Sequence, residues 1–384
     1  MNATVSRLFN EFFESEKTGG IVLMICTAVS ILAANVIGNP YVDLWHHKLG
    51  FSFSGIQLDY SIQHWINDGL MTVFFLLVGL EIERELYAGE LSDLKSASLP
   101  IAAAAGGVIL PAGIHLALNH GGPTQAGFGI PMATDIAFSL GVLSLLGNRV
   151  PVSLKIFLTA FAIIDDLCAI VIIAVFYSKG ISILSLSVSL TIFAVLVILN
   201  RIRFSRLPVY LLLGVVMWYF MLRSGVHATI SGVLLAFAIP FTKDDDNPSY
   251  RLQHLLHKPV AFFILPLFAI ANTGLIVNIS QISNLLSSNS MGILLGLVAG
   301  KPLGIFVFSI VGISLNICRY PADTNWKHLL GIGMLGGIGF TMSIFITNLA
   351  YEDTAIIQGS IIAVMLASMI SGLLGYIFLK FIRA

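Results

Sequence analysis

Two adjacent carboxylates, Asp165 and Asp166, lie in the apolar stretch FLTAFAIIDDLCAIVIIAVFY. An aspartate at the centre of a membrane helix costs about 2.5–3.5 kcal/mol, so two neighbours are expensive unless they serve a purpose. Asp135 and Lys301 also lie inside long apolar stretches. One lysine cannot neutralise three carboxylates, so a structural ion pair explains only part of this charge. The surplus acid indicates a site that binds cations or protons.

Asp165 and Asp166 point in different directions, because consecutive side chains of a helix diverge by about 100°. They therefore do not form a pair of acids that face each other and share one proton. Thr159 and two alanines accompany Asp166, whereas mostly bulky residues accompany Asp165. We infer that Asp166 faces a cavity or a closely packed helix, and that Asp165 faces a neighbouring helix and Lys301. The small residues are equally consistent with helix packing alone.

Two apolar stretches contain residues that interrupt a helix. In GFGIPMATDIAFSLGVLSLLG, residues 129–131 (Gly-Ile-Pro) precede Thr134 and Asp135. In GIGMLGGIGFTMSIFI, three glycines within residues 336–339 precede Thr341. A break in a membrane helix leaves backbone groups that only a protein-lined or watery site can satisfy. Single glycines commonly serve packing, but two breaks in corresponding positions are better explained as a functional pair.

Interrupted helices also explain the other two buried charges. Each break places helix N-termini, worth about +0.5 charge, and C-termini, worth about −0.5 charge, inside the membrane. Asp135 stands beside one break and suits the positive ends. Lys301, in GLVAGKPLGIFVF, suits the negative ends or Asp165. The alternative for Lys301 is a side chain that reaches the membrane surface, although it lies roughly ten residues, or about 15 Å, inside its stretch.

The composition identifies an integral membrane protein. The 384-residue chain is 57% hydrophobic and only 10% charged, with a mean hydropathy of +0.92, whereas a soluble domain has about 25% charged residues. Long apolar stretches favour helices over the short alternating segments of a β-barrel. A net charge of +0 argues against a nucleic-acid partner. The three cysteines have no metal or redox spacing, and the polar N-terminus predicts no cleavable signal.

A membrane helix needs about 20 apolar residues, and twelve stretches meet or approach this length. They are residues 19–36, 64–82, 98–118, 123–146, 152–177, 182–199, 207–222, 225–240, 259–278, 290–316, 328–349 and 356–379. Of the 20 Lys and Arg residues, Lys301 lies in a span, three (Lys48, Lys179, Arg223) fall on one side, and the other sixteen fall on the opposite side. The positive-inside rule therefore predicts that both termini are cytoplasmic.

Residues 49–61, LGFSFSGIQLDYS, alternate apolar and polar residues on both sides of Ser54-Gly55. This pattern predicts a β-hairpin, within residues 45–61, on the outer side of the membrane. A lone hairpin is marginally stable in water, so pairing with the hairpin of a second copy is plausible.

The chain is expected to form a single transmembrane domain, residues 1–384, that contains a repeat. Spans three to five (residues 98–177) and ten to twelve (residues 290–379) each carry the interrupted helix in the middle. Seven spans separate the two segments, so they would enter the membrane from opposite sides. Inverted repeats with discontinuous helices that cross at the midplane are typical of secondary transporters.

Several motifs together resemble the NhaA-type bacterial sodium/proton antiporters. They are FAIIDDLCAI, PMATDIAFSLGVLSLLG, FFLLVGLEIERELYAGEL, SGVHATISG, AGKPLGI and GGIGFTMSIFI. The match runs in order from about Phe9 to Leu379. It implies a twelve-helix transporter of the bacterial inner membrane that exchanges Na⁺ or Li⁺ for H⁺ and takes part in pH homeostasis and salt tolerance.

The resemblance also implies roles for individual residues. Asp166 matches the principal cation ligand and Asp165 its partner in ion and proton exchange. Thr134 and Asp135 match the acidic break of the fourth helix, and Lys301 the compensating lysine of the tenth. The hairpin matches the family's dimerisation element, which implies a homodimer. Positions linked to the cytoplasmic funnel and to pH activation match Glu81, Glu85, His227, His254 and His257.

Two residues depart from the family pattern. Cys168 stands where the motif usually has glycine after IIDDL, and a small buried cysteine should be tolerated there. Gln253 replaces the glutamate that often precedes the first histidine of the pH-sensing helix, which weakens that part of the match. A solvated helix end is an equally good interpretation of His254 and His257.

The expected mechanism is competition between ions. Na⁺ and Li⁺ prefer oxygen ligands, which Asp166, Asp165 and Thr134 can supply, and burial favours the protonated form of a carboxylic acid. Two titrating groups per cation make the exchange electrogenic, and the second proton can reside on Asp165 or Lys301. No cofactor is expected. A proton-coupled symporter is the nearest alternative, whereas an intramembrane aspartyl protease needs facing acids from two helices, and a channel needs no titratable site.

Overall fold

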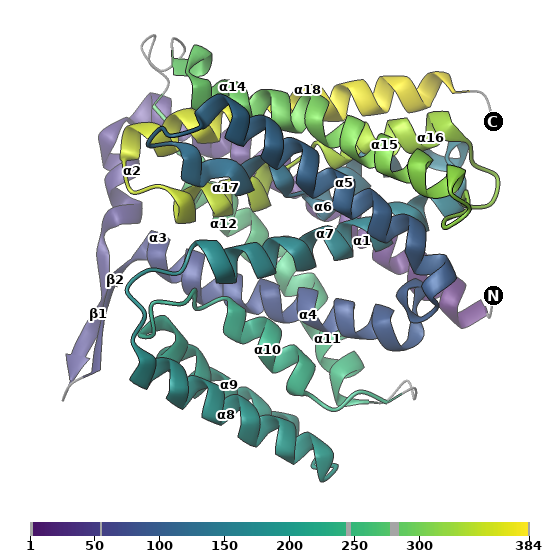
Figure 1. Ribbon diagram of the computed structural model, residues 1–384. Helices are drawn as coiled ribbons and strands as arrows, with labels where there is room; N and C mark the ends of the chain where they lie inside the picture. Colours follow the sequence, from purple (N-terminus) through teal and green to yellow (C-terminus); the bar gives the residue numbers. More distant parts are fainter. Residues whose placement is uncertain (1–2, 54–55, 243–246, 277–283, 383–384) are drawn as a thin grey trace. The chain divides into compact units, whose positions relative to one another are not determined.

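The computed structural model describes residues 3–53, 56–242, 247–276 and 284–382, and it is almost entirely helical (Figure 1). Within these ranges, nine helices are long and apolar enough to cross a membrane, and a tenth span is possible if a bent pair of helices is counted as one. The nine are Thr18–Ile37, Ile62–Ala88, Lys95–Asn119, Gln125–Ser144, Val152–Phe176, Ile183–Arg201, Pro248–Asn272, Ser288–Ser314 and Thr354–Phe381. The all-α membrane fold expected from the composition is confirmed.

All twelve predicted spans coincide with helical segments. Three of these segments are either bent or shorter than the roughly 20 residues that a membrane helix needs. The eleventh consists of α16 (Trp326–Gly336) and α17 (Phe340–Ala350), which meet at 46°. The seventh is the apolar helix α9 (Leu207–Leu222). The eighth, predicted over residues 225–240, is reduced to the nine-residue helix α10 (Ile230–Ala238). Sequence hydropathy thus located the spans but overestimated the length of α10. It also placed the ninth span at residues 259–278, whereas the observed helical span is Pro248–Asn272 and residues 277–278 lie outside the described ranges.

The chain divides into two compact units. Unit 1 comprises residues 1–22, 89–169 and 277–384, and unit 2 comprises residues 23–88 and 170–276. The helices α1 (Ala3–Ile37) and α7 (Val152–Phe176) each contribute residues to both units.

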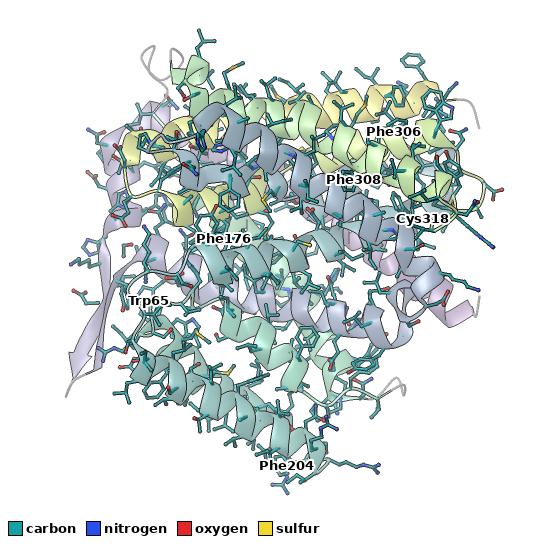
Figure 2. All side chains as sticks on the ribbon, in the orientation of Figure 1. Trp65, Phe176, Phe204, Phe306, Phe308 and Cys318 are labelled. Atoms are coloured by element: carbon teal, nitrogen blue, oxygen red, sulfur yellow. The ribbon has the colours of Figure 1, made fainter. Side chains whose placement is uncertain are left out.

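Unit 1 is built on a close pair of helices, α5 (Leu94–Asn119) and α15 (Lys301–Ser314), which run side by side in Figure 1. Glycine allows this approach, because a Cβ on Gly106 would lie 2.1 Å from the carbonyl oxygen of Gly304, and the reverse also holds. Figure 2 shows Phe306 and Phe308 along α15, and Cys318 just beyond its end. The other elements of unit 1 are η2 (Glu90–Ser92), η3 (Gln125–Met132), α6 (Ile136–Ser144), η4 (Gly147–Arg149), η6 (Asn284–Leu286), α14 (Ser288–Leu295), η7 (Gly296–Gly300), α16, α17 and α18 (Thr354–Phe381).

Unit 2 has its own apolar core. The buried residues Leu80, Leu196, Tyr210, Met217 and Ala236 bring together α4 (Met71–Ala88), α8 (Ile183–Arg201), α9 and α10. The other elements of this unit are α2 (Asn39–His46), β1 (Lys48–Phe53), β2 (Ile56–Ser61), α3 (Ile62–His64), η1 (Trp65–Leu70), α11 (Pro248–Pro259), η5 (Val260–Ile264) and α12 (Leu265–Asn272).

The predicted β-hairpin is confirmed. Strands β1 and β2 pair antiparallel in a register that runs from Lys48 opposite Ser61 to Phe53 opposite Ile56, while the turn at residues 54–55 lies outside the described ranges. Trp65, labelled in Figure 2, anchors the hairpin to the helices of unit 2, because its indole N–H donates to the carbonyl of Leu49 at 2.8 Å.

Candidate ion-binding site

The fourth span is interrupted where its sequence predicts. The 3₁₀ helix η3 ends at Met132, residues 133–135 are not helical, and α6 begins at Ile136. Asp135 caps α6, because its Oδ1 accepts a hydrogen bond from the backbone N–H of Phe138 at 2.9 Å. A carboxylate at this position accepts a hydrogen bond from a backbone N–H of the first turn, and the positive end of the helix dipole stabilises its negative charge.

The break in the eleventh span lies directly against the break in the fourth. The backbone N–H of Asp135 donates to the carbonyl of Ile338 at 2.7 Å, and the Thr134 hydroxyl donates to the carbonyl of Gly336 at 2.8 Å. Beyond the break, the Ser343 hydroxyl donates to the carbonyl of Ile130 at 2.7 Å. Each interruption therefore satisfies backbone groups that the other leaves exposed, as a membrane interior requires.

Asp135 stabilises the start of two helices at once. Its Oδ2 accepts hydrogen bonds from the backbone N–H of Thr341 at 3.1 Å and from the Thr341 hydroxyl at 2.5 Å, in the first turn of α17. One buried carboxylate thus compensates the N-termini of both α6 and α17. The sequence located Asp135 beside a break but did not identify Thr341 as its partner. The available signal was a hydroxyl residue placed two positions after the last glycine of the break.

Lys301 is fully buried, which excludes the surface-reaching alternative. Its ammonium group forms an ion pair with Asp165 Oδ2 at 2.7 Å and donates to the carbonyl of Met132. Met132 is the last residue of η3, where the helix dipole is negative. The ammonium also lies 5.8 Å from the ring centroid of Phe161. The ion pair between Asp165 and Lys301 agrees with the expectation from helix geometry.

The two adjacent aspartates are both buried, at 1% exposure each. Thr134 faces Asp165 with its hydroxyl and backbone N–H, so the break of the fourth span adjoins this carboxylate. Cys168 is half-buried one turn further along α7, in the neighbourhood of both aspartates and Lys301. In the described ranges, no group of three or more His, Cys, Asp or Glu side chains is arranged to hold a resident metal ion.

A second set of ionisable residues gathers at the C-terminal end of α4, within unit 2. Glu81 interacts with Arg84, Glu85 and the side chain of Gln253 on α11. Arg84 also lies 3.1 Å from Glu85 in an ion pair. On α11, His257 is near Arg84 and His254, and His254 itself is exposed. The structure therefore brings together most of the residues that resemble a pH-sensing cluster.

His227 does not join this cluster. It lies 3.6 Å from the carboxylate of Asp68, which is also 3.0 Å from His64. Asp68 precedes Glu81 by thirteen residues along η1 and α4, a distance of about 20 Å in a helix. The sequence grouped His227 with the Glu81 cluster through the resemblance alone, and it did not identify Asp68 and His64 as neighbours of His227.

The sequence also missed a buried acid, Glu83. This residue is only 3% exposed on α4, and its Oε2 accepts a hydrogen bond from the Ser249 hydroxyl of α11 at 3.0 Å. Glu83 lies in the charged stretch EIERE, just beyond the predicted span of residues 64–82, and was not predicted to be buried. Only the packing of α11 against α4 reveals that it is buried.

Two interrupted membrane helices whose breaks meet beside buried carboxylates and a buried lysine define a secondary active transporter. Comparison with known proteins gives the family. Residues 10–379 match the Na⁺/H⁺ antiporter 1 family, and the chain belongs to this family. It is therefore a transporter rather than an enzyme.

Curated relatives match over nearly their whole length. The Na⁺/H⁺ antiporter NhaA of Flavobacterium psychrophilum is 57% identical over 98% of this chain and 97% of its own. The NhaA proteins of Cytophaga hutchinsonii and Dechloromonas aromatica are 57% and 56% identical, over 98% and 99% of this chain and 96% and 97% of their own chains.

Proposed function

We propose that this chain exchanges intracellular Na⁺ or Li⁺ for external H⁺. Family membership and the names of its curated relatives support the reaction class. One observation in the structure supports the assignment of the ion-binding site. The buried ion pair between Asp165 and Lys301, at 2.7 Å, adjoins Asp166 and the break that contains Thr134.

The chemistry follows from the oxygen atoms that these residues supply. Na⁺ and Li⁺ bind carboxylate and hydroxyl oxygens, and Asp166, Asp165 and Thr134 provide both kinds. Because the Thr134 hydroxyl hydrogen is used by the carbonyl of Gly336, its oxygen lone pairs remain available to a cation. A cation and a proton cannot occupy the same carboxylate oxygen, so the binding of one expels the other.

Lys301 couples the cation to a second proton. When a cation binds the aspartates, it competes with the ammonium group for Asp165, and a proton leaves the pair. Return of protons restores the ion pair seen in the structure. More than one proton per cation makes the cycle electrogenic, and alternating access moves the site between the two sides of the membrane.

The setting of this reaction is the inner membrane of a bacterium, with both termini cytoplasmic and the hairpin of residues 45–61 joining two copies into a homodimer. Residues 98–177 and 290–379 act as inverted repeats, and the meeting of the two breaks supports this arrangement. Acidic pH reduces activity through the cluster at the end of α4. Its members are Glu81, Glu85, Gln253, His254 and His257, with His227 acting separately beside Asp68.

The test uses the purified protein in liposomes with an imposed pH gradient and an enclosed pH-sensitive dye. Added Na⁺ or Li⁺ should dissipate the gradient, whereas added K⁺ should not. If neither cation dissipates it, the proposal is wrong. Dissipation that requires an organic solute would identify a proton-coupled symporter instead. Equal turnover at about pH 6.5 and about pH 8.5, on either side of the ordinary histidine pKa, would contradict pH regulation.

A further inference from the structure

The tenth span changes its helical geometry just before Lys301. The span begins as α14, passes through the π-helical turn η7 and continues as α15. At the end of η7, the backbone N–H of Lys301 donates to the carbonyl of Gly296, five residues earlier, whereas an α-helix would use the residue four earlier. The turn that leads to the buried ion pair therefore contains one extra residue.

The spacing of glycines explains why the span needs this turn. Gly292, Gly296, Gly300 and Gly304 recur at every fourth position. In a continuous α-helix, the last of them would lie about 120° around the helix from the first. In the structure, however, all four lie against α5. The extra residue of η7 offsets about 100° of this rotation, so both halves of the span present small residues to α5 and pack closely against it.

The same turn lies against both interrupted helices. A Cβ on Gly296 would be 2.6 Å from the Cβ of Pro131, which belongs to η3 just before the break of the fourth span. A Cβ on Gly337, in the break of the eleventh span, would overlap the carbonyl oxygen of Leu297 in η7. These neighbours are backbone and proline atoms, which cannot move aside as a flexible side chain can. The position of η7 relative to the two breaks is therefore closely fixed.

We propose that η7 is a positioning element that sets the rotation of Lys301, and that Gly296 is the positioning residue at its contact with the fourth span. The Lys301 ammonium group meets two partners at once, Asp165 Oδ2 at 2.7 Å and the carbonyl of Met132. Pro131, the neighbour of Met132, packs against Gly296. Gly296 in turn accepts the backbone N–H of Lys301. The geometry of the ion pair thus depends on how closely η7 approaches η3.

The inference rests on the proposed exchange, in which a cation competes with Lys301 for Asp165. If η7 moves away from Pro131, the ammonium group can no longer meet both partners at their present distances, and the ion pair weakens. A cation then displaces Lys301 more easily, so the KM for Na⁺ should fall. General damage to packing would lower the maximal rate or raise the KM instead.

The test measures the exchange rate in proteoliposomes at several Na⁺ concentrations and one pH. Gly296→Ala places a methyl group against Pro131, so η7 must shift, and the KM for Na⁺ should fall by about three- to ten-fold. Gly113→Ala on α5 is the matched control, because its methyl group meets no other segment within 4 Å, and its KM should stay unchanged. Gly331→Ala is the packing control. Its methyl group overlaps Leu379 between α16 and α18, which should lower stability without lowering the KM.

Thermal unfolding in detergent checks that each variant folds. If Gly296→Ala does not fold, Gly300→Ala must lower the KM in its place, because it shifts the same turn more gently, against the end of the Ile114 side chain at 2.8 Å. An unchanged or raised KM in the folded variant would overturn the inference, as would an equal fall in either control. If the unmodified protein shows no Na⁺-driven exchange, the proposed function fails. If it exchanges Na⁺ and the variants of η7 keep its KM, only the role of η7 fails.

Discussion

The two clusters of buried acids differ in what compensates them. In unit 1, Asp135 is held by two helix N-termini and Asp165 by Lys301. In the described part of unit 2, Glu83 has the Ser249 hydroxyl as its polar partner, and Gln253 contacts Glu81. A carboxylate inside a membrane is less costly where positive charge or several hydrogen-bond donors compensate it.

Asp166→Asn should have the largest effect on exchange. The amide cannot carry the charge that balances a cation, so Na⁺-driven exchange should fall by more than about 100-fold. Asp323→Asn is a matched control, because Asp323 is exposed and has a φ of 57°, a conformation that asparagine also adopts. Normal exchange by Asp166→Asn would remove this residue from the site.

Lys301→Met should have the largest effect on stability. The change leaves Asp165 without its partner in a fully buried position, and breaking a buried ion pair costs about 3–5 kcal/mol. Thermal unfolding in detergent measures the loss. Lys301→Met combined with Asp165→Leu should recover part of it. If the double variant recovers none of the lost stability, Lys301 stabilises unit 1 through other contacts.

Thr341→Val should have an intermediate effect. It keeps the shape of the side chain but removes the hydroxyl that donates to Asp135 at 2.5 Å, so stability should fall by about 1–2 kcal/mol. Exchange should slow as well, because the two breaks are less firmly held together. The control is Thr347→Val, where the lost bond is a local one to the carbonyl of Ser343. Equal destabilisation by both variants would contradict a special role for the contact between the breaks.

Cys168→Gly should have the smallest effect and restores the residue usual in the family. Glycine inside a helix lowers stability by about 1 kcal/mol relative to better helix formers. The exchange rate should change by less than a few-fold, because the thiol adjoins the aspartates but is no part of their ion pair. A large change in Na⁺ affinity, measured from the exchange rate at several Na⁺ concentrations, would show that Cys168 shapes the ion site.

Much of the fold could be predicted from the sequence, since hydropathy is a local property. Apolar length located the helices, glycine and proline located both interruptions, and alternating residues located the hairpin. The length of α10 was not predicted in this way, because residues 225–229 adjoin an apolar stretch but are not helical. Helix geometry and the helix dipoles predicted either Asp165 or a negative helix end as the partner of Lys301, and the structure shows both contacts.

Other features depended on tertiary packing. Thr341 and Asp135 are far apart in the sequence and meet because the two interrupted helices lie against each other. His227 looked like a member of the Glu81 cluster but lies beside Asp68 instead. Glu83 was not among the predicted buried charges, but it is buried and contacts Ser249 of α11. The sequence alone shows which charged residues are unfavourable inside a membrane. A compensating charge or hydrogen bond must lie within a few ångströms of such a residue, so only the folded structure decides which partner supplies it.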